Sequence, residues 1–171
     1  PVHADAGYFR VGENRYYVPL WLVVPGSNVP FSTSRNQDRA TLDILGVVRN
    51  QQQRPVAFIQ DTVKLNIDAT AEVRRKNVQY ATSFELPPGT YRLRVVVREN
   101  QDGTVGSLET SLVIPDITRQ KPLLSSVVMV TQRMPAERRR MNPLVQNGQD
   151  LVGSVTKVVT RTQTLTLFYE I

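Results

Sequence analysis

The stretch FELPPGTYRLRVVVREN, residues 84–100, decides the fold class. Its second half alternates between two kinds of side chain. The odd-numbered positions carry the apolar residues Tyr91, Leu93, Val95 and Val97, and even-numbered positions carry Arg92, Arg94 and Arg98. Because successive side chains of a strand project to opposite faces of a sheet, this pattern predicts a half-buried β-strand. Pro87-Pro88-Gly89 predicts a tight turn before it, since proline fixes φ and glycine allows φ > 0.

The first two thirds of the chain consist of strand-like runs separated by turn signals. The runs are residues 6–11, 15–26, 41–50, 54–67, 77–86, 89–100 and 104–115. Asp102-Gly103 predicts a hairpin between the last two runs, and helix formers at 68–77 predict one or two helical turns. The strands recur about every 8–12 residues without long helices between them, so the pattern does not favour a parallel sheet.

These features predict an all-β fold. Residues 1–115 are expected to form an antiparallel β-sandwich of the immunoglobulin or fibronectin type, with about seven strands. The alternation predicts six core residues: Val18, Leu20, Leu22, Leu93, Val95 and Val97. Trp21 shares the face of Tyr17 and is interpreted as a core aromatic, the alternative being a sugar-stacking surface.

The pattern changes after Pro115. Residues 116–122 are predicted to be a linker, and 123–171 a smaller β-rich C-terminal segment. Within that segment we expect a strand at 123–132, a basic proline-bounded loop at 133–143 and a hairpin at Asn147-Gly148. The strands are too few for a complete second sandwich, so the segment either extends the first sheet or forms an incomplete second sandwich.

The residue types needed for catalysis are scarce. The chain has no cysteine and a single histidine, His3, so thiolate nucleophiles, Ser-His-Asp triads and His-rich or Cys-rich metal sites have almost no residues to draw on. A cation site at Glu99 and Asp102 competes with plain turn chemistry, in which a carboxylate accepts backbone N–H groups, and the sequence favours the latter. We expect a non-enzymatic protein with no catalytic residue, no metal and no cofactor.

The net charge of +6 favours anionic partners, which include polysaccharide, nucleic acid and membrane surfaces. The competing interpretation is that arginines simply occupy the solvent face of strands, and it is favoured over nucleic-acid binding because no aromatic-plus-basic platform is present. Three residues of the basic loop are candidates for contact with an anion: Arg138, Arg139 and Arg140. No apolar run approaches the roughly 18–20 residues of a transmembrane helix.

Four segments resemble one known family. They are AGYFRVGENRYYVPLWLVVPGS, FELPPGTYRLRVVVRENQDGTVGSLETSLVIPD, LLSSVVMVTQ and NPLVQNG…DLVGSVTKVVTRTQTLTLFYEI. Together they are similar to the C-terminal region of the von Willebrand factor A-related proteins of acidobacteria. The A domain and its D-x-S-x-S metal motif are absent from this sequence, so the resemblance carries over no metal ligand. Members of that family continue beyond the position of Ile171, so we expect both ends of the chain to be trimmed.

The resemblance implies an extracellular or bacterial cell-surface location, and the closing sequence suggests a role there. In TRTQTLTLFYEI an apolar stripe, defined by Leu165, Leu167, Tyr169 and Ile171, shares one strand face. We expect this strand, or the N-terminal strand with Tyr8, Phe9 and Val11, to add to the sheet edge of a second copy, giving a homo-oligomer or a filament. Pairing of 160–171 within its own chain is the alternative for this strand. The other candidate function is adhesion to an anionic polysaccharide.

Overall fold

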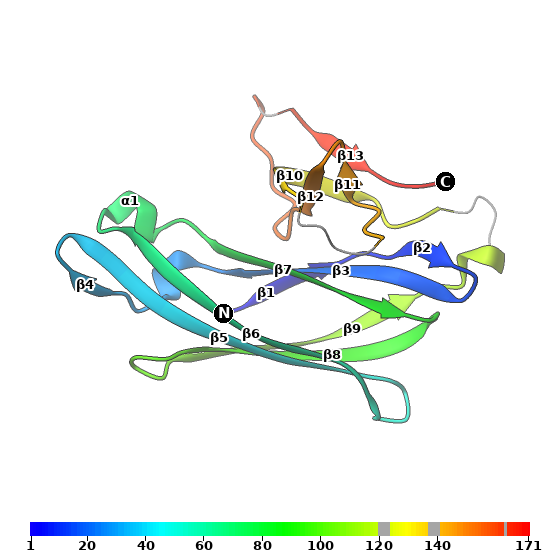
Figure 1. Ribbon diagram of the computed structural model, residues 1–171, viewed down its shortest axis with the longest axis horizontal. Helices are drawn as coiled ribbons and strands as arrows, with labels where there is room; N and C mark the ends of the chain where they lie inside the picture. Colours follow the sequence, from blue (N-terminus) through cyan, green and yellow to red (C-terminus); the bar gives the residue numbers. More distant parts are fainter. Residues whose placement is uncertain (120–123, 137–140, 163) are drawn as a thin grey trace. The chain divides into compact units, whose positions relative to one another are not determined.

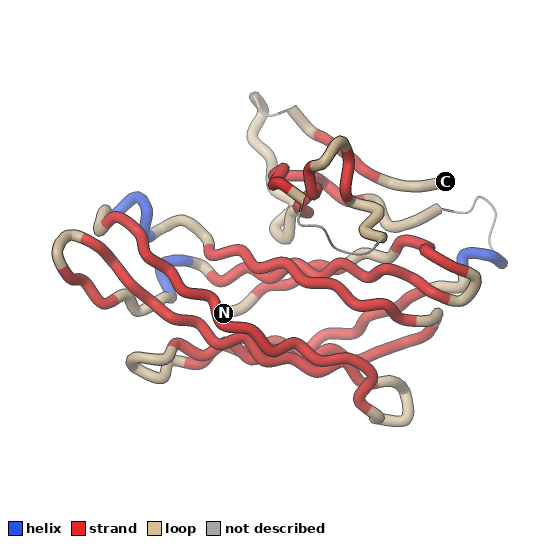
Figure 2. The backbone as a smooth tube through the Cα atoms, in the orientation of Figure 1, coloured by secondary structure: helices blue, strands red, loops and turns tan. Residues whose placement is uncertain are grey.

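The computed structural model describes residues 1–119, 124–136, 141–162 and 164–171, which are mostly strand (Figure 2). The strands are β1 (His3–Ala6), β2 (Phe9–Gly12), β3 (Arg15–Val24), β4 (Ser32–Ser34), β5 (Gln37–Arg49), β6 (Pro55–Asp68), β7 (Val78–Leu86), β8 (Gly89–Glu99), β9 (Val105–Ile114), β10 (Val128–Pro135), β11 (Val145–Gln146), β12 (Gln149–Gly153) and β13 (Thr166–Phe168). The helical elements are η1 (Gly26–Asn28), α1 (Ala71–Arg74) and η2 (Ile117–Arg119).

The strands of the described residues form three sheets (Figure 1). One has the order β1-β3-β2 with β7 also paired to β3, the second the order β4-β5-β8-β9 with β6 also paired to β5, and the third the order β11-β12-β10-β13. The predicted fold class is confirmed: the protein is an all-β antiparallel sandwich with a smaller β-rich C-terminal part.

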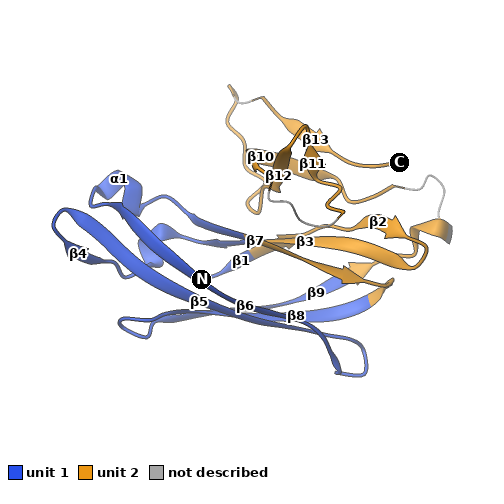
Figure 3. Cartoon of the chain, in the orientation of Figure 1, with its two compact units in different colours: residues 1–3, 22–80, 90–112 blue, residues 4–21, 81–89, 113–171 orange. Residues whose placement is uncertain are grey.

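The chain forms two compact units that are interleaved along the sequence (Figure 3). Unit 1 contains residues 1–3, 22–80 and 90–112, and unit 2 contains residues 4–21, 81–89 and 113–171. The division differs from the boundary placed at residue 115, because an N-terminal segment, 4–21, and a central segment, 81–89, belong to the same unit as the C-terminal sheet.

The long strand β5 organises unit 1. It pairs antiparallel with β6 from Gln37↔Asp68 to Arg49↔Pro55, and on its other side with β8 from Leu42↔Glu99 to Arg49↔Arg92. β5 reverses into β6 between residues 49 and 55, where a turn was predicted between the runs 41–50 and 54–67. All six predicted core residues are buried: Val18, Leu20, Leu22, Leu93, Val95 and Val97. The period-two pattern therefore predicted the buried face of β8, whereas β3 is buried at consecutive positions from Val18 to Val23.

Turn chemistry explains the short connections of unit 1. Gly103 has a φ of 77° in the predicted hairpin between β8 and β9, a conformation that glycine adopts without strain. The predicted helical turn is also confirmed as α1, capped by the Thr70 hydroxyl, which accepts a hydrogen bond from the Val73 N–H. The β4–β5 hairpin was missed by the sequence analysis. Its reversal uses positive φ at Arg35 and Asn36, and arginine is not a usual turn residue.

In unit 2, β3 is buried on both faces. Tyr16 is fully buried, and its hydroxyl accepts a hydrogen bond at 3.1 Å from the Ile117 N–H. Trp21, of opposite parity to Tyr16, packs into a cluster with six residues of β2 and the C-terminal sheet region: Phe9, Val128, Val130, Leu144, Leu151 and Val152. The interpretation of Trp21 as a core aromatic is confirmed, because it is only 4% exposed.

The C-terminal sheet differs from its predicted extents. β10 begins at Val128, although a strand was predicted from residue 123, and it pairs with β12 on one side and β13 on the other. The Asn147-Gly148 hairpin is confirmed, with φ values of 51° and 75°. Of the strand-like residues 154–171, only β13 is strand in the described part. The Ser154 hydroxyl accepts a hydrogen bond from the Lys157 N–H, and such a local turn competes with sheet pairing.

Gly153→Ala tests the packing of Trp21. A Cβ at residue 153 would lie 2.8–2.9 Å from three atoms of the Trp21 ring, closer than van der Waals contact permits. We expect the variant to lose about 1–3 kcal/mol of unfolding free energy, as overpacked cores do. Urea unfolding followed by the fluorescence of Trp21, the single tryptophan, measures this.

Gly12→Ala is the matched control. The nearest atom to its added Cβ would be 3.5 Å away, on Arg15, which is ordinary contact. An equal loss of stability in the two variants would show that the effect comes from strand glycines in general and not from the contact with Trp21.

Candidate interaction surfaces

The apolar stripe lies on β13 and the residues beside it. Leu165, Leu167 and Tyr169 are each about half exposed, and Ile171 is 86% exposed. Phe168, of opposite parity, turns inward and lies 5.6 Å from Phe9, measured between ring centroids. All four residues of the stripe are thus exposed, and only Leu167 of the four lies within β13.

β13 is an edge strand that pairs within its own chain. Its three residues lie opposite β10 in the register Val128↔Phe168, Met129↔Leu167 and Val130↔Thr166. Within the described residues β10 is its sole strand neighbour, because β13 ends the sheet order. Of the two alternatives that the sequence left open, the structure contains pairing in the same chain, and no strand in the described ranges pairs with the second edge of β13.

The N-terminal candidates do not form a comparable surface. Phe9 is fully buried in the Trp21 cluster, so its prediction as an interface residue is wrong. The backbone of Tyr8 is already used, since its N–H donates to the Ser126 hydroxyl and its carbonyl accepts from the Ser126 N–H. Val11 is half-buried and lies at a cavity.

That cavity has a volume of about 740 Å³ and lies within unit 2. It brings Val11 and Ile171, predicted separately as interface residues, to one site together with Arg10, Ser125 and Glu170. Burial raises the pKa of the Glu170 carboxyl above its ordinary value. The Ser125 hydroxyl donates to the Ser126 carbonyl and accepts from the Glu170 N–H, so it fixes the backbone there and is not arranged as an activated nucleophile.

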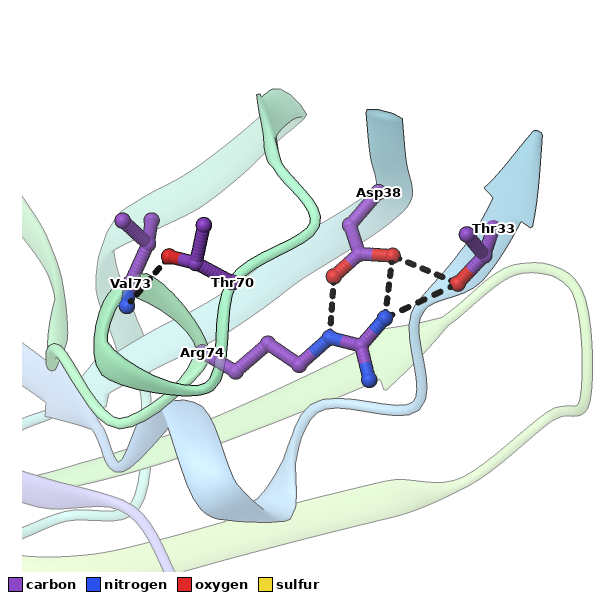
Figure 4. Close-up of polar contacts among 5 residues, drawn as sticks. All are labelled: Thr33, Asp38, Thr70, Val73 and Arg74. Atoms are coloured by element: carbon purple, nitrogen blue, oxygen red, sulfur yellow. Dashed lines mark hydrogen bonds and ion pairs between the residues drawn. The ribbon is translucent and has the colours of Figure 1, made fainter. Parts of the chain in front are cut away.

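A polar cluster joins α1 to the β4–β5 hairpin (Figure 4). Both carboxylate oxygens of Asp38, a fully buried residue, accept hydrogen bonds from the Arg74 guanidinium, one of them from Nη2 at 2.8 Å. The Thr33 hydroxyl donates to Asp38 at 2.6 Å and accepts from Arg74 at 3.0 Å. These hydrogen bonds, that of Arg74 first, hold the pKa of Asp38 below its ordinary value of 3.8. The cluster is fully paired and is therefore structural.

The carboxylates at the β8–β9 turn also bind backbone. Glu99 is buried, and its carboxylate accepts hydrogen bonds from the N–H groups of Gln101 and Asp102 at 2.7 and 3.0 Å. Asp102 in turn accepts from the Thr104 N–H, which lowers the pKa of Asp102. These contacts are those of turn chemistry, which the sequence favoured over a cation site. In the described part of the chain, no group of three acidic, histidine or cysteine side chains could hold a metal ion.

A third surface, not predicted from the sequence, is the outward face of β6, β5 and β8, here called the open face. The strand registers align three rows across it: Phe58–Val47–Arg94, Gln60–Leu45–Val96 and Thr62–Asp43–Arg98. Phe58 is 71% exposed and Leu45 is 53% exposed, which is unusual for large apolar side chains of a sheet. An apolar centre flanked by arginines thus lies on one face of unit 1.

The three arginines of the predicted basic loop, Arg138, Arg139 and Arg140, lie outside the described residues. Among the described helices, none is long and apolar enough to cross a membrane.

Comparisons with known proteins assign the chain to no family. No protein-family model and no curated protein matches the chain. Among solved structures, a glycosyl hydrolase family 2 member from Bacteroides cellulosilyticus is 15% identical with a TM-score of 0.44, and a β-glucuronidase from Bacteroides uniformis is 10% identical with a TM-score of 0.47. Each match covers 66% of this chain but only 14% and 13% of those chains. The chain spans about a seventh of their length, and similarity this low carries no argument about its activity.

The buried Asp38 is expected to make folding stability depend on acid pH. Its pKa is lowered in the folded state, so its contribution is complete above the ordinary value of 3.8 and is lost as the pH falls through the folded value. We expect Asp38→Asn to be clearly less stable than the wild type at pH 7, with the difference narrowing as the pH falls below 3.8. Urea unfolding followed by circular dichroism between pH 7 and pH 3 measures this difference.

Asp68→Asn, an exposed position at the end of β6, is the control for general charge effects. A stability difference for Asp38→Asn that stays constant across the pH range would contradict the assignment of the acid dependence to this carboxyl.

Proposed function

We propose that the chain is a non-enzymatic association module that binds copies of itself by β-strand addition at β13. The observation that carries the proposal is an edge strand whose second edge pairs with no strand of the described residues, flanked by an exposed apolar stripe. Strand edges present unpaired N–H and C=O groups, and proteins ordinarily protect them with charges, prolines or covering segments. β13 is short, which is itself a form of edge protection, but every second residue of the stripe from Leu165 to Ile171 is apolar, so these positions carry neither charge nor proline.

The backbone edge of β13 and the side chains of the stripe both favour the addition of a strand from another copy. The backbone edge offers hydrogen bonds to an added strand, and the alternate side chains offer the apolar contacts that select it. A sheet of four strands with β13 at its end gains a fifth strand from a neighbour. Addition of β13 to the β13 edge of another copy closes as a dimer, whereas addition to a different edge continues head to tail as a filament.

The setting that fits this function is the outside of a bacterial cell. The sequence resemblance to von Willebrand factor A-related proteins of acidobacteria supports that setting, and the lack of cysteine is compatible with it. A structural or matrix role also accords with the shortage of histidine and cysteine, which leaves few groups for nucleophilic or metal catalysis. The association is thus proposed for a surface assembly and not for an enzyme.

The double substitution Leu165→Lys/Leu167→Lys tests the proposal. Lysine charges block edge association, and removing two leucines from an interface costs roughly 1.5–3 kcal/mol each, a loss of at least about a hundredfold in affinity. We expect the wild-type sedimentation coefficient to rise with protein concentration and that of the variant to stay at the monomer value. Sedimentation velocity measures both.

Val158→Lys/Val159→Lys is the matched control, because these residues are also exposed and apolar but lie in a described segment outside any strand. It should associate as the wild type does. A wild-type protein that remains monomeric at high concentration, or equal loss of association in both double variants, would rule out the role of the stripe.

A further inference from the structure

We propose that the open face of β6, β5 and β8 binds an acidic polysaccharide, with Phe58 and the arginines of β8 as its main contacts. This function is separate from association through β13 and belongs to residues of unit 1 alone. The sequence suggested an anionic partner from net charge only, and located it in a loop. The structure points to a different set of residues.

The charges of the open face form a line. Arg92, Arg94, Val96 and Arg98 share one face of β8, on which successive side chains are about 6.6–6.8 Å apart, so Val96 separates Arg94 from Arg98. Arg49 lies opposite Arg92 in the register and extends the line onto β5. Asp43 lies opposite Arg98, but the arginines outnumber it on this face, and a row of cations complements a linear polymer with repeating anionic groups.

Two of these arginines are available to a ligand. Arg92 forms an ion pair with Glu109 at 3.2 Å, and Arg49 donates to the Gln53 carbonyl at 2.8 Å. Arg94 and Arg98 are exposed, and neither has an ion pair or hydrogen bond to a side chain in the described parts of the chain. A guanidinium binds carboxylate or sulfate oxygens through paired N–H donors, so Arg94 and Arg98 provide the strongest unoccupied anion contacts on this face.

The apolar centre supplies the second type of contact. Phe58 lies in the same row as Val47 and Arg94, so an aromatic ring and a cation face one ligand. Beside that row, Leu45 and Val96 widen the apolar area. The C–H faces of sugar rings are apolar and pack on such a surface, while their acidic groups lie toward the arginines. Ionic contacts alone would not require Phe58.

Binding of polygalacturonate, a carboxylated polysaccharide, tests the proposal with the full chain. Immobilised polygalacturonate should retain the wild type more strongly than neutral dextran does, and less as salt is raised. Arg94→Gln/Arg98→Gln should weaken binding at least about tenfold, because each lost charge-assisted contact is worth roughly that factor. Phe58→Ala should weaken it several-fold with no change in net charge.

Arg133→Gln/Arg161→Gln removes the same charge from exposed positions of unit 2 and should change binding less than twofold, the range expected when no direct contact is lost. Unchanged circular dichroism spectra and melting temperatures show that all variants are folded. Equal losses in the two arginine pairs, or an unchanged affinity for Phe58→Ala, would overturn the proposal. Binding of poly-glutamate with the same dependence on Phe58 would also overturn it, because the ligand would then be an acidic polypeptide. Loss of self-association in the open-face variants would overturn it as well, because the open face would then be an interface between copies of the chain.

Discussion

Burial of β3 on both faces is the constraint on which much of this structure depends. The central residues of β3, from Val18 to Val23, are all buried. Their side chains alternate between the two faces, so the strand needs an apolar cover on each side. On one side Trp21 meets the C-terminal sheet so closely that a Cβ at residue 153 would lie only 2.8–2.9 Å from its ring. The C-terminal sheet is consequently part of the same hydrophobic core as β2 and β3, and not a separate tail. Its edge strand β13 is held in place by that packing, through Phe168 against Phe9.

The alternation of apolar and polar residues was enough to predict the fold class and the core. In β8 every second residue from Tyr91 to Val97 is buried, as the pattern in the sequence requires. Features that depend on competing local contacts were harder to predict. The turn at Arg35 and Asn36 lacks glycine, and the strand-like sequence after residue 153 instead begins with a turn held by Ser154. Propensity alone does not reveal such local alternatives.

The candidate surfaces were predictable to different degrees. The stripe from Leu165 to Ile171 follows from period-two spacing within one segment, so the sequence located it. Phe9 was assigned incorrectly because its ring partner, Phe168, is brought to it only by the pairing of β13 with β10. The open face was missed for a similar reason: Phe58 and Arg94 become neighbours across Val47 only through the registers of three strands. One signal for the exposure of Phe58 was present in the sequence: Phe58 is adjacent to Ile59 in a strand, so their side chains lie on opposite faces, and Ile59 is the buried one.

Association through a strand edge makes a specific demand on the backbone. If a second copy adds to β13, the N–H groups of residues 165–171 that point away from β10 become hydrogen-bonded when the chains associate, and hydrogen exchange detects this directly. Hydrogen–deuterium exchange followed by mass spectrometry at low and high protein concentration is therefore the most direct measurement. The account predicts that protection rises with concentration in peptides covering 165–171, while exchange in β5 and β8 is unchanged. Concentration-dependent association with no added protection in 165–171 would contradict it.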